Sequence, residues 1–466
     1  MEDDYTTYSF AELLSNIVDN RGKTCPVDDA GLPLIATNCV KNDTLFPVFK
    51  KVRYVNQETY DTWFRGHPEP GDMIFVCKGS PGNVCWTPEP VNFCIAQDMV
   101  AIRANQKIVD SKYLFSLLRS PVTQTKILNM HVGTLIPHFK KGDFKNLYFD
   151  IPNDKGVQKA IGNIYFRFSE RIELNSRMNE TLEAMAQALF KSWFVDFDPV
   201  IDNALAGGKE IPAELSEKSQ ARVTLGDKRS PLPEEIRTLF PDEFSYSDEL
   251  GWIPKGWEVG SLADVCFVKG GYAFKSKDFT TSGYPVIKIK NINNDRTVSA
   301  TDVQYIPKDI ANNVENFWLS PGDLIMAMTG ATVGKFGLLV PEMEKTYLLN
   351  QRVAKFYPID AISPKLWFVY CCLCQKNVFD YIVNVAHGSA QPNVSAATIM
   401  ATTILRPDDE IIRVFNNMFD GNFVKMLSNR ETVQTLSKLR DTLLPKLLSG
   451  EIRIPDAEKM VEELAL

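Results

Sequence analysis

The sequence predicts an α+β protein built as a pseudo-twofold tandem repeat, in which two similar α/β domains are joined by two long antiparallel helices that form a coiled coil. Two helical stretches carry apolar residues at heptad spacing, and most of these positions recur at an offset of about 254. Short motifs outside the helices recur at nearly the same offset. Between the helices, short β-rich runs alternate with Gly- and Pro-containing turns.

The first long helix is expected from Val157 to Phe190, after an N-cap at Asn153 or Asp154. The apolar positions that we expect to pair with a partner helix are Val157, Ile161, Ile164, Phe168, Met178, Leu182, Met185 and Leu189. The pattern turns polar at Arg171 and Asn175 and then resumes. A narrow stripe of this kind requires a helical partner.

The second helix is expected to begin after Asp408 or Asp409 and to end at Gly450. Its apolar positions are Ile411, Phe415, Met418, Leu436, Leu439 and Leu443. The copy is imperfect at Asn422 and Thr432, and its polar positions are Lys425 and Asn429. An intramolecular antiparallel pair is the economical solution, and Asn175 and Asn429 would form polar layers that fix its register.

The repeat extends into the two domains. Gly31-Leu-Pro-Leu-Ile recurs as Gly283-Tyr-Pro-Val-Ile, and Gly71-Asp-Met-Ile recurs as Gly322-Asp-Leu-Ile. Each Pro-Gly-Asp turn should open a strand, at Met73 and at Leu324, and helical runs should follow at 112–118 and 364–373.

These patterns divide the chain into six parts. They are a first domain (1–152), the first helix (153–198), a connector (199–252), a second domain (253–407), the second helix (408–450) and a tail (451–466). The connector is rich in Pro, Gly and acid and should hold one short helix at 234–240. Residues 455–466 are either an amphipathic helix, with Met460, Val461 and Leu464 on its apolar side, or a frayed terminus.

Composition is that of a globular chain. It has 466 residues, 44% of them hydrophobic and 23% charged, with a net charge of −7. This length favours more than one domain. No apolar run approaches the roughly 18 residues of a membrane span, and the acidic start Met1-Glu-Asp-Asp lacks the features of a signal peptide. A cytoplasmic location is therefore expected.

The nine cysteines fit a reducing compartment. Cys371 to Cys374 contains a CxxC spacing, but it lies in an apolar run without a second pair or a neighbouring His, so we favour core packing over a metal site. The four histidines show no metal-binding spacing: His67, His131, His138 and His387. We expect no metal ion.

A paired architecture favours a symmetric partner. Duplex DNA is one, because paired domains can read two half-sites at a fixed spacing. A symmetric protein scaffold would show the same pattern. A basic stretch between 265 and 296 is either a DNA-facing surface or an ordinary solvated face: Lys269, Lys275, Lys277, Lys288, Lys290 and Arg296.

Three segments carry a resemblance to a known family. They are Phe190-Lys-Ser-Trp-Phe-Val-Asp-Phe-Asp-Pro-Val200, Leu250-Gly-Trp-Ile-Pro-Lys-Gly-Trp-Glu-Val259 and Leu439-Arg-Asp-Thr-Leu-Leu-Pro-Lys-Leu-Leu-Ser-Gly-Glu-Ile452. They resemble the specificity subunit of type I restriction-modification enzymes, and the repeat plan matches over nearly the whole chain. The Ile-Pro-Lys-Gly-Trp opening precedes only the second domain, so the start of the first domain is less well marked.

The resemblance implies a non-catalytic, DNA-reading subunit with two target-recognition domains. Each domain would bind one half of a bipartite target in double-stranded DNA, with a nonspecific spacer whose length the helices set. The helices would dock two methyltransferase (M) subunits, which use S-adenosylmethionine, and through them the ATP- and Mg-dependent restriction and translocase (R) subunits. No cofactor is expected on this chain. The run Gly330-Ala-Thr-Val-Gly334-Lys335-Phe336 is one residue short of a phosphate-binding loop and favours a turn between strands.

The predicted DNA contacts lie in polar, Gly-containing loops placed equivalently in the two halves. Glycine permits close backbone approach, Gln and Asn can pair with adenine, and Arg and Lys can contact guanine or phosphate. The candidates are Lys78, Ser80, Asn83, Gln97, Thr134, His138, Lys140, Lys141, Lys275, Lys277, Thr329, Thr332, Lys335, Gln351, Arg352, Ser389, Gln391 and Asn393. The lysines at 140, 141, 275 and 277 suit phosphate better than bases, and each candidate could also belong to an ordinary surface loop.

Two alternatives concern the helices and the class of protein. Four aromatic residues near the end of the first helix could contact the methyltransferase subunits or simply pack under the connector: Phe190, Trp193, Phe194 and Phe197. The rival classes are a methyltransferase or nuclease fused to recognition domains, and a protein-binding scaffold without its own DNA specificity. The sequence shows neither an Asn-Pro-Pro-Tyr nor an Asp-Pro-Pro-Tyr methyltransferase motif.

Overall fold

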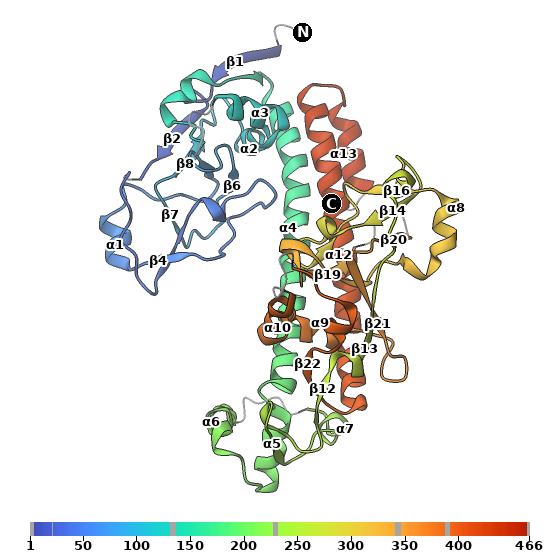
Figure 1. Ribbon diagram of the computed structural model, residues 1–466. Helices are drawn as coiled ribbons and strands as arrows, with labels where there is room; N and C mark the ends of the chain where they lie inside the picture. Colours follow the sequence, from blue (N-terminus) through green and yellow to red (C-terminus); the bar gives the residue numbers. More distant parts are fainter. Residues whose placement is uncertain are drawn as a thin grey trace. The chain divides into compact units, whose positions relative to one another are not determined.

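The computed structural model describes residues 4–20, 22–130, 137–226, 232–340, 346–386 and 392–463. The chain forms two compact units: unit 1 comprises residues 1–177 and 432–466, and unit 2 comprises residues 178–431. Each unit combines one of the two α/β domains with a part of each long helix, α4 (Lys155–Phe194) and α12 (Asp409–Leu448) (Figure 1).

Unit 1 places short strands beside the first part of α4 and the last part of α12. Its strands are β1 (Tyr5–Ser9), β2 (Leu14–Val18), β3 (Leu32–Ile35), β4 (Arg53–Val55), β5 (Met73–Val76), β6 (Val84–Trp86), β7 (Cys94–Ile95), β8 (Met99–Ala104) and β9 (Tyr148–Pro152). Its other helices are α1 (Gln57–Thr62), α2 (Ser111–Arg119), α3 (Pro121–Met130) and α13 (Ile454–Glu463). The strands pair in the orders β1-β9, β2-β8-β5-β6 and β4-β3-β7.

Unit 2 holds the second domain and the connector. Its strands are β10 (Phe244–Ser247), β11 (Gly251–Pro254), β12 (Glu258–Ser261), β13 (Cys266–Gly270), β14 (Tyr284–Ile287), β15 (Thr297–Val298), β16 (Gln304–Ile306), β17 (Trp318–Leu319), β18 (Leu324–Ala327), β19 (Phe336–Leu339), β20 (Tyr347–Leu349), β21 (Val353–Pro358) and β22 (Thr403–Arg406). Its shorter helices are α5 (Asp198–Gly207), α6 (Ser216–Leu225), α7 (Glu234–Arg237), α8 (Lys308–Ala311), α9 (Trp367–Cys374), α10 (Lys376–Ala386) and α11 (Ala396–Met400).

The two units repeat one strand topology. The order β2-β8-β5-β6 of unit 1 matches β13-β21-β18-β19 of unit 2, and β4-β3-β7 matches β16-β14-β20. In both copies the second of these sheets contains one parallel pair, β3 with β7 and β14 with β20. Unit 2 adds β15 beside β19 and β17 beside β20. The predicted tandem α+β repeat is therefore confirmed down to the order of the strands.

The Pro-Gly-Asp turns recur because each anchors a sheet through an ion pair. The almost fully buried carboxylate of Asp72 accepts from Nε of Arg103 on β8 at 2.8 Å and from a terminal guanidinium nitrogen at 3.0 Å. In unit 2, Nζ of Lys355 on β21 lies 2.6 Å from the Asp323 carboxylate. Burial raises the pKa of Asp323, and the Lys355 ammonium opposes that shift. An aspartate of the turn is thus paired with a cation of the neighbouring strand in both units, with Arg103 on β8 in one and Lys355 on β21 in the other.

The long helices run antiparallel in each unit. In unit 2 the rings of Phe190 and Phe415 lie 5.9 Å apart, and the side chains of Asn179 and Asn429 are hydrogen-bonded at 3.0 Å, so residue numbers rise along one helix as they fall along the other. In unit 1 the Arg440 guanidinium lies 5.4 Å from the Tyr165 ring centroid. Helix packing in each unit buries a continuous apolar face.

Most of the helix-pairing candidates are inside these cores. The buried ones are Ile161, Ile164, Phe168, Asn175, Ile411, Phe415, Asn429, Leu436 and Leu443, and the half-buried ones are Val157, Leu182, Leu189 and Leu439. Met185 and Met418 are exposed, at 53% and 46%, and so is Met178. The prediction is wrong for these three methionines.

The error has a geometric cause. The buried face passes through the residue after each of the three methionines: Asn179, Ala186 and Phe419. On α12 the buried face continues through Phe423 and Met426. Phe423 directly follows Asn422, one of the two positions at which the sequence repeat is imperfect. A straight helix has 3.6 residues per turn and drifts by about 20° per heptad against a strict repeat, so over about five heptads, roughly the length of these helices, the buried stripe moves by one residue position.

The predicted asparagine layers also require correction. The amide of Asn429 donates to Oδ1 of Asn179, and Nδ2 of Asn179 lies 3.3 Å from the carbonyl oxygen of Met426. Nδ2 of Asn175 instead donates to the carbonyl oxygen of Arg171 in its own helix, at 2.8 Å. Asn179, and not Asn175, is thus the partner of Asn429.

The connector is more ordered than its composition suggested. Beyond the expected short helix, α7, it forms α5, α6 and the hairpin of β10 and β11. The aromatic residues at the end of α4 and just after it pack beneath the connector: the ring of Trp193 lies 5.0 Å from that of Phe240, and the ring of Phe197 lies 6.3 Å from that of Phe244. Between the two alternatives for these aromatic residues, the structure shows packing under the connector.

The tail forms α13, whose residues Ala457 and Val461 are buried in the unit 1 core. Met460, expected on the apolar side, is 44% exposed, and Leu464 lies outside the described residues. Among the helices that the structure describes, none has the length and apolar character needed to cross a membrane. The nine cysteines are free thiols, and Cys371 and Cys372 are buried in the unit 2 core, as the packing interpretation predicts.

Candidate nucleic-acid interface

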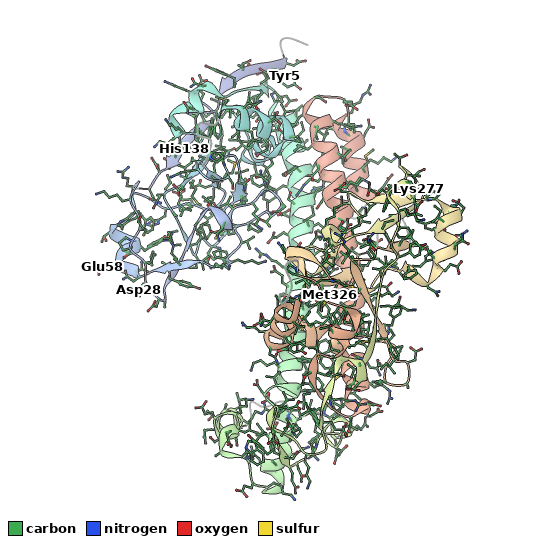
Figure 2. The ribbon with its side chains drawn as sticks, in the orientation of Figure 1. Tyr5, Asp28, Glu58, His138, Lys277 and Met326 are labelled. Atoms are coloured by element: carbon green, nitrogen blue, oxygen red, sulfur yellow. The ribbon has the colours of Figure 1, made fainter. Side chains whose placement is uncertain are left out.

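Three polar loops of unit 1 lie side by side beyond the end of β5. Lys78 and His138, the latter labelled in Figure 2, form an isolated antiparallel bridge. The backbone N–H of Gly79 donates to the carbonyl oxygen of Pro137 at 3.0 Å, and that of Cys77 donates to the carbonyl oxygen of Asp98 at 2.9 Å. The loop after β5, the turn before β8 and the segment before η3 (Lys141–Asn146) therefore form one surface.

Unit 2 builds the same surface from its own loops. Thr329 and Asn393 form the corresponding antiparallel bridge. The N–H of Gly330 donates to the carbonyl oxygen of Pro392 at 2.9 Å, and the N–H of Met328 donates to the carbonyl oxygen of Arg352 at 2.9 Å. We call these two sets of segments, residues 77–83, 97–98 and 137–141 in unit 1 and 328–335, 351–352 and 392–394 in unit 2, the loop clusters.

The two loop clusters share a backbone and differ in side chains. Directly opposed residues of a β-bridge project to the same side, so Lys78 lies beside His138 in one cluster and Thr329 beside Asn393 in the other. A conserved frame with exchanged polar groups can present different hydrogen-bonding patterns to two partners.

The candidates differ in their exposure. Exposed residues are Ser80, Lys140, Lys141, Lys275, Lys277, Gln351, Arg352 and Asn393. Half-buried residues are Lys78, Asn83, Gln97, His138, Thr329, Thr332 and Lys335. Thr134, Ser389 and Gln391 lie outside the described residues.

Several candidates already have partners within the protein. The amide of Asn83 donates to the carbonyl oxygen of Val40 at 3.0 Å, and Lys141 is ion-paired with Asp19. The hydroxyl oxygens of Thr329 and Thr332 are buried and, within the described part of the chain, have no hydrogen-bond partner. These two hydroxyls are therefore poorly placed to meet a DNA base.

Lys275 and Lys277 lie apart from the backbone contacts that build the unit 2 cluster. They belong to the turn around η7 (Ser276–Asp278), and both are exposed. Figure 2 labels Lys277. Their position on an open turn suits the sequence-independent phosphate contact that was predicted for them.

A buried thiol supports the unit 1 cluster from beneath. Burial raises the pKa of Cys77 to about 12, with a further contribution from the Asp19 carboxylate that the nearby Lys141 ammonium opposes. The thiol therefore stays protonated at neutral pH and acts as a small core group.

Sequence reasoning missed Tyr272, an exposed ring next to the unit 2 cluster. Its N–H donates to the carbonyl oxygen of Leu349 at 2.9 Å, and its carbonyl oxygen accepts from the N–H of Gln351 at 2.9 Å. The preceding Gly271 permits this approach, because a Cβ there would lie 2.3 Å from the carbonyl oxygen of Asn350. The Gly270-Gly271 pair was the signal that could have revealed it.

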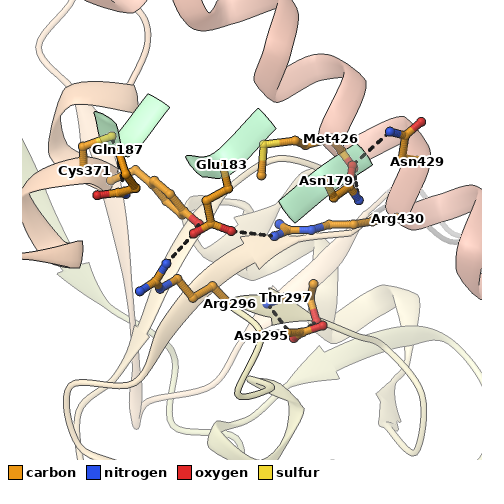
Figure 3. Close-up of polar contacts among 11 residues, drawn as sticks. Asn179, Glu183, Gln187, Asp295, Arg296, Thr297, Cys371, Met426, Asn429 and Arg430 are labelled. Carbon is orange, nitrogen blue, oxygen red and sulfur yellow. Dashed lines mark hydrogen bonds and ion pairs between the residues drawn. The ribbon is translucent and has the colours of Figure 1, made fainter. Parts of the chain in front are cut away.

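A half-buried carboxylate links the two helices of unit 2 to its recognition domain (Figure 3). Glu183 of α4 accepts a hydrogen bond from the Tyr370 hydroxyl of α9 at 2.9 Å and is ion-paired with Arg296. Arg430 of α12 lies 3.9 Å from the same carboxylate. Arg296 was noted in the sequence only as part of a basic stretch, and its tie to α4 could not be seen there because its partner is 113 positions away.

The loop clusters suit recognition. Exposed amide, guanidinium and ammonium groups can hydrogen-bond to base edges and phosphates, and the rigid sheet beneath holds them in place. In the described residues, no group of three or more His, Cys, Asp or Glu side chains could hold a metal ion.

Known proteins match both halves of the chain. The family model described as "Type I restriction modification DNA specificity domain" matches residues 22–184 and 254–443. The "Type I restriction enzyme HindI specificity subunit" of Haemophilus influenzae is 33% identical over 393 residues, which cover 78% of this chain and 82% of that protein. The MjaIX specificity subunit of Methanocaldococcus jannaschii is 24% identical over 353 residues, covering 75% and 70% of the two chains.

A solved structure supports the fold. The crystal structure of the type I restriction-modification S subunit from M. genitalium superimposes with a TM-score of 0.54 at 14% identity, covering 95% of this chain and 96% of that one. With both halves matched by the family model and a relative at 33% identity over most of its length, the chain belongs to the DNA specificity subunits of type I restriction-modification systems, non-catalytic proteins that recognise DNA within a complex whose partner subunits carry the enzymatic activity.

Proposed function

We propose that this chain recognises a bipartite DNA target, with one half-site read by the loop cluster of each unit and a nonspecific spacer between them. The observation that carries this proposal is the repeated loop cluster: matching backbone hydrogen bonds hold three loops together in both units, while the side chains on that frame differ. Two frames with different polar groups suit two different short sequences.

The long helices would set the spacer length. Parts of α4 and α12 contribute to the core of each unit, so the helices connect the two recognition domains. A connection through two long helices would favour half-sites at one fixed separation. In this proposal a change in helix length changes the spacer and leaves the recognised bases unaltered.

The helices would also dock two methyltransferase subunits. Support comes from apolar side chains that α4 and α12 leave exposed: Leu174, Met178, Met185, Met418 and Val424. Leu174, Met178 and Met185 fall on one face of α4 by their helical spacing, and an exposed apolar face of this kind is typical of protein interfaces. The docked subunits would use S-adenosylmethionine to methylate adenine, and restriction subunits bound through them would use ATP and Mg. The cytoplasmic location stays a prediction from the sequence.

The test is a map of methylated adenine in cells that express this chain with its cognate methyltransferase subunit, compared with cells that express the methyltransferase alone. A split motif that appears only when both are present supports the proposal and identifies the target. An intact complex that methylates no specific site would favour a protein-binding scaffold.

A further inference from the structure

Unit 2 contains a pocket of about 290 Å³ beside its loop cluster. The pocket lies between the turn that precedes β15, the end of the loop that precedes β19, and the junction of α9 with α10. Its polar lining residues are Asn293, Asn294, Arg296, Lys335, Cys374 and Lys376. Three of these six carry a positive charge.

The corresponding place in unit 1 is filled by the protein itself. Arg119 is the last residue of α2, as Cys374 is the last residue of α9, and in both units the next helix begins two residues later. The buried guanidinium of Arg119 donates to the carbonyl oxygens of Val84, Lys41 and Thr44. The Arg119 side chain thus fastens the end of α2 to β6 and to the loop at 41–44.

The two loops beside these helix ends are also equivalent. In unit 1 the N–H of Trp86 on β6 donates to the carbonyl oxygen of Leu45 at 2.8 Å. In unit 2 the N–H of Leu338 on β19 donates to the carbonyl oxygen of Arg296 at 3.1 Å. Unit 2 has the same backbone arrangement, but the short Cys374 takes the place of the arginine. A pocket is therefore open in unit 2 at the position that the Arg119 side chain fills in unit 1.

Unit 2 surrounds this space with cations from three elements. The Lys376 side chain, at the start of α10, is 90% exposed and is ion-paired with Asp380. Lys335 occupies the position that precedes β19, where unit 1 has Asn83 before β6. Among the described residues, no carboxylate lies within ion-pairing distance of Lys335.

Arg296 is held in the pocket by an unusual backbone and by α4. Its φ of 59° is left-handed, a conformation that is uncommon for residues other than glycine and that tends to persist where surrounding structure enforces it. The ion pair with Glu183 fixes the guanidinium from one side, while its side chain remains 39% exposed. The arginine is therefore a positioned cation at the pocket wall.

We propose that this pocket binds one phosphate of the DNA backbone at the edge of the half-site that unit 2 reads. The assignment rests on the proposed function, and it adds a contact that unit 1 does not have. Lys335 and the exposed Lys376, which is ion-paired with Asp380, supply ammonium groups, Arg296 supplies a guanidinium held by Glu183, and the exposed Asn294 amide can donate a further hydrogen bond. Phosphate is favoured over a base edge because the charged groups that line the pocket surface are cationic.

The test uses the complete complex of this chain with its methyltransferase subunits and a duplex that contains its mapped target. Each of Lys335→Gln and Lys376→Gln should lower the slope of log K against log salt by about one, without changing the methylated motif. The matched control is Lys209→Gln, because Lys209 is also ion-paired, with Glu243, but belongs to the connector. It should leave the slope unchanged.

Ethylation interference on the same duplex locates the contact. Ethylation of one phosphate beside one half-site should weaken binding of the wild-type complex and have no further effect on Lys335→Gln. Unchanged salt slopes and an unchanged interference pattern in both lysine variants would overturn the assignment. A wild-type complex that binds no split target would instead refute the proposed function, so the two failures are distinguishable.

Titration with inorganic phosphate at constant ionic strength distinguishes a phosphate of the DNA backbone from free phosphate as the anion that the pocket binds. The proposal predicts that phosphate weakens DNA binding by the wild-type complex more than by Lys335→Gln. Phosphate binding that is lost in Lys335→Gln, together with an interference pattern that the variant leaves unchanged, would identify a free-phosphate site and overturn the DNA assignment.

Discussion

Single polar residues fix how the two long helices pair. The side chains of Asn179 and Asn429 are buried and hydrogen-bonded to each other, and Asn179 also lies within hydrogen-bonding distance of the Met426 carbonyl oxygen. A buried amide without a partner costs more than the hydrogen bond contributes, so a shift in register that separates the pair is penalised. Polar side chains at such positions are known to specify register at some cost in stability.

Replacing Asn179 alone should therefore destabilise the protein. In Asn179→Leu the buried Asn429 amide loses its acceptor, and we expect a loss of about 1–3 kcal/mol in the free energy of unfolding, measured by urea denaturation. The double variant Asn179→Leu with Asn429→Leu should recover most of this loss, because both polar groups are gone.

Asn175→Leu is the matched control. The Asn175 amide donates to the Arg171 carbonyl of its own helix at 2.8 Å, so among the described residues its removal leaves no partner across the helix pair unsatisfied. Equal losses for Asn175→Leu and Asn179→Leu would contradict the assigned register.

Burial should also make the Cys77 thiol unreactive. Its pKa is raised from 9.0 to about 12, so the nucleophilic thiolate is almost absent at pH 8. We expect iodoacetamide to leave Cys77 unmodified in the folded protein and to alkylate it after unfolding in urea, as measured by mass spectrometry.

The sign of the linked pH effect follows from the same shift. Because the folded-state pKa lies above the unfolded-state value, this group stabilises the fold fully below about pH 9, and the contribution is lost as the pH rises toward 12. Rapid alkylation of Cys77 in the folded protein at pH 8 would show that the loop cluster opens in solution.

At the scale of elements, the recognition surfaces depend on close contacts between loops and strands. Gly271 lies so near the turn after β20 that a Cβ would meet the carbonyl oxygens of Asn350 and Leu349 at 2.3 and 2.4 Å. Backbone atoms cannot move aside as flexible side chains do, so the segment carrying Tyr272 would have to separate from the loop cluster.

Gly271→Ala should thus lower both stability and DNA binding by unit 2, and hydrogen exchange of the Tyr272 and Gln351 amides should become faster. Gly421→Ala on α12 is the control, because a Cβ there meets nothing within 4 Å. Since alanine favours helix over glycine, that variant should gain up to about 1 kcal/mol. A Gly271→Ala protein with unchanged exchange would argue against the close approach.

The sequence predicted the loop clusters well and the buried face of the long helices only in part. The loop clusters were predictable because the two halves repeat: Gln97 matches Gln351, and Pro137 matches Pro392, at offsets of 254 and 255. The helix face was partly missed because apolar character favoured Met178 and Met185 over Asn179 and Ala186. Packing favours the small alanine and a hydrogen-bonded asparagine at those positions, and a hydrophobicity pattern alone predicts neither of them.

Long-range partners were beyond sequence reasoning altogether. The ties among Glu183, Arg296 and Tyr370 join residues more than a hundred positions apart, and no local pattern marks them. The connector was assigned one helix because Pro, Gly and acid dominate its composition, yet aromatic residues such as Phe240 and Trp257 supply enough apolar contact to order it.

The whole molecule consists of two units with the same strand topology, and each unit is made from a recognition domain and a part of both long helices. The design explains why a change in one loop cluster should be local. The backbone contacts that build each cluster lie within its own unit, so altered side chains in one need not disturb the other.

The most direct test of this account is a map of methylated adenine for a chain altered only in the unit 1 loop cluster. Lys78→Thr with His138→Asn gives unit 1 the side chains that unit 2 carries at the bridge, Thr329 and Asn393. We expect the altered complex still to methylate a split target in which one half-site is changed or relaxed, while the other half-site and the spacer stay the same. Changes in both half-sites, or no change in either, would contradict the central claim that each loop cluster reads its own half of the target.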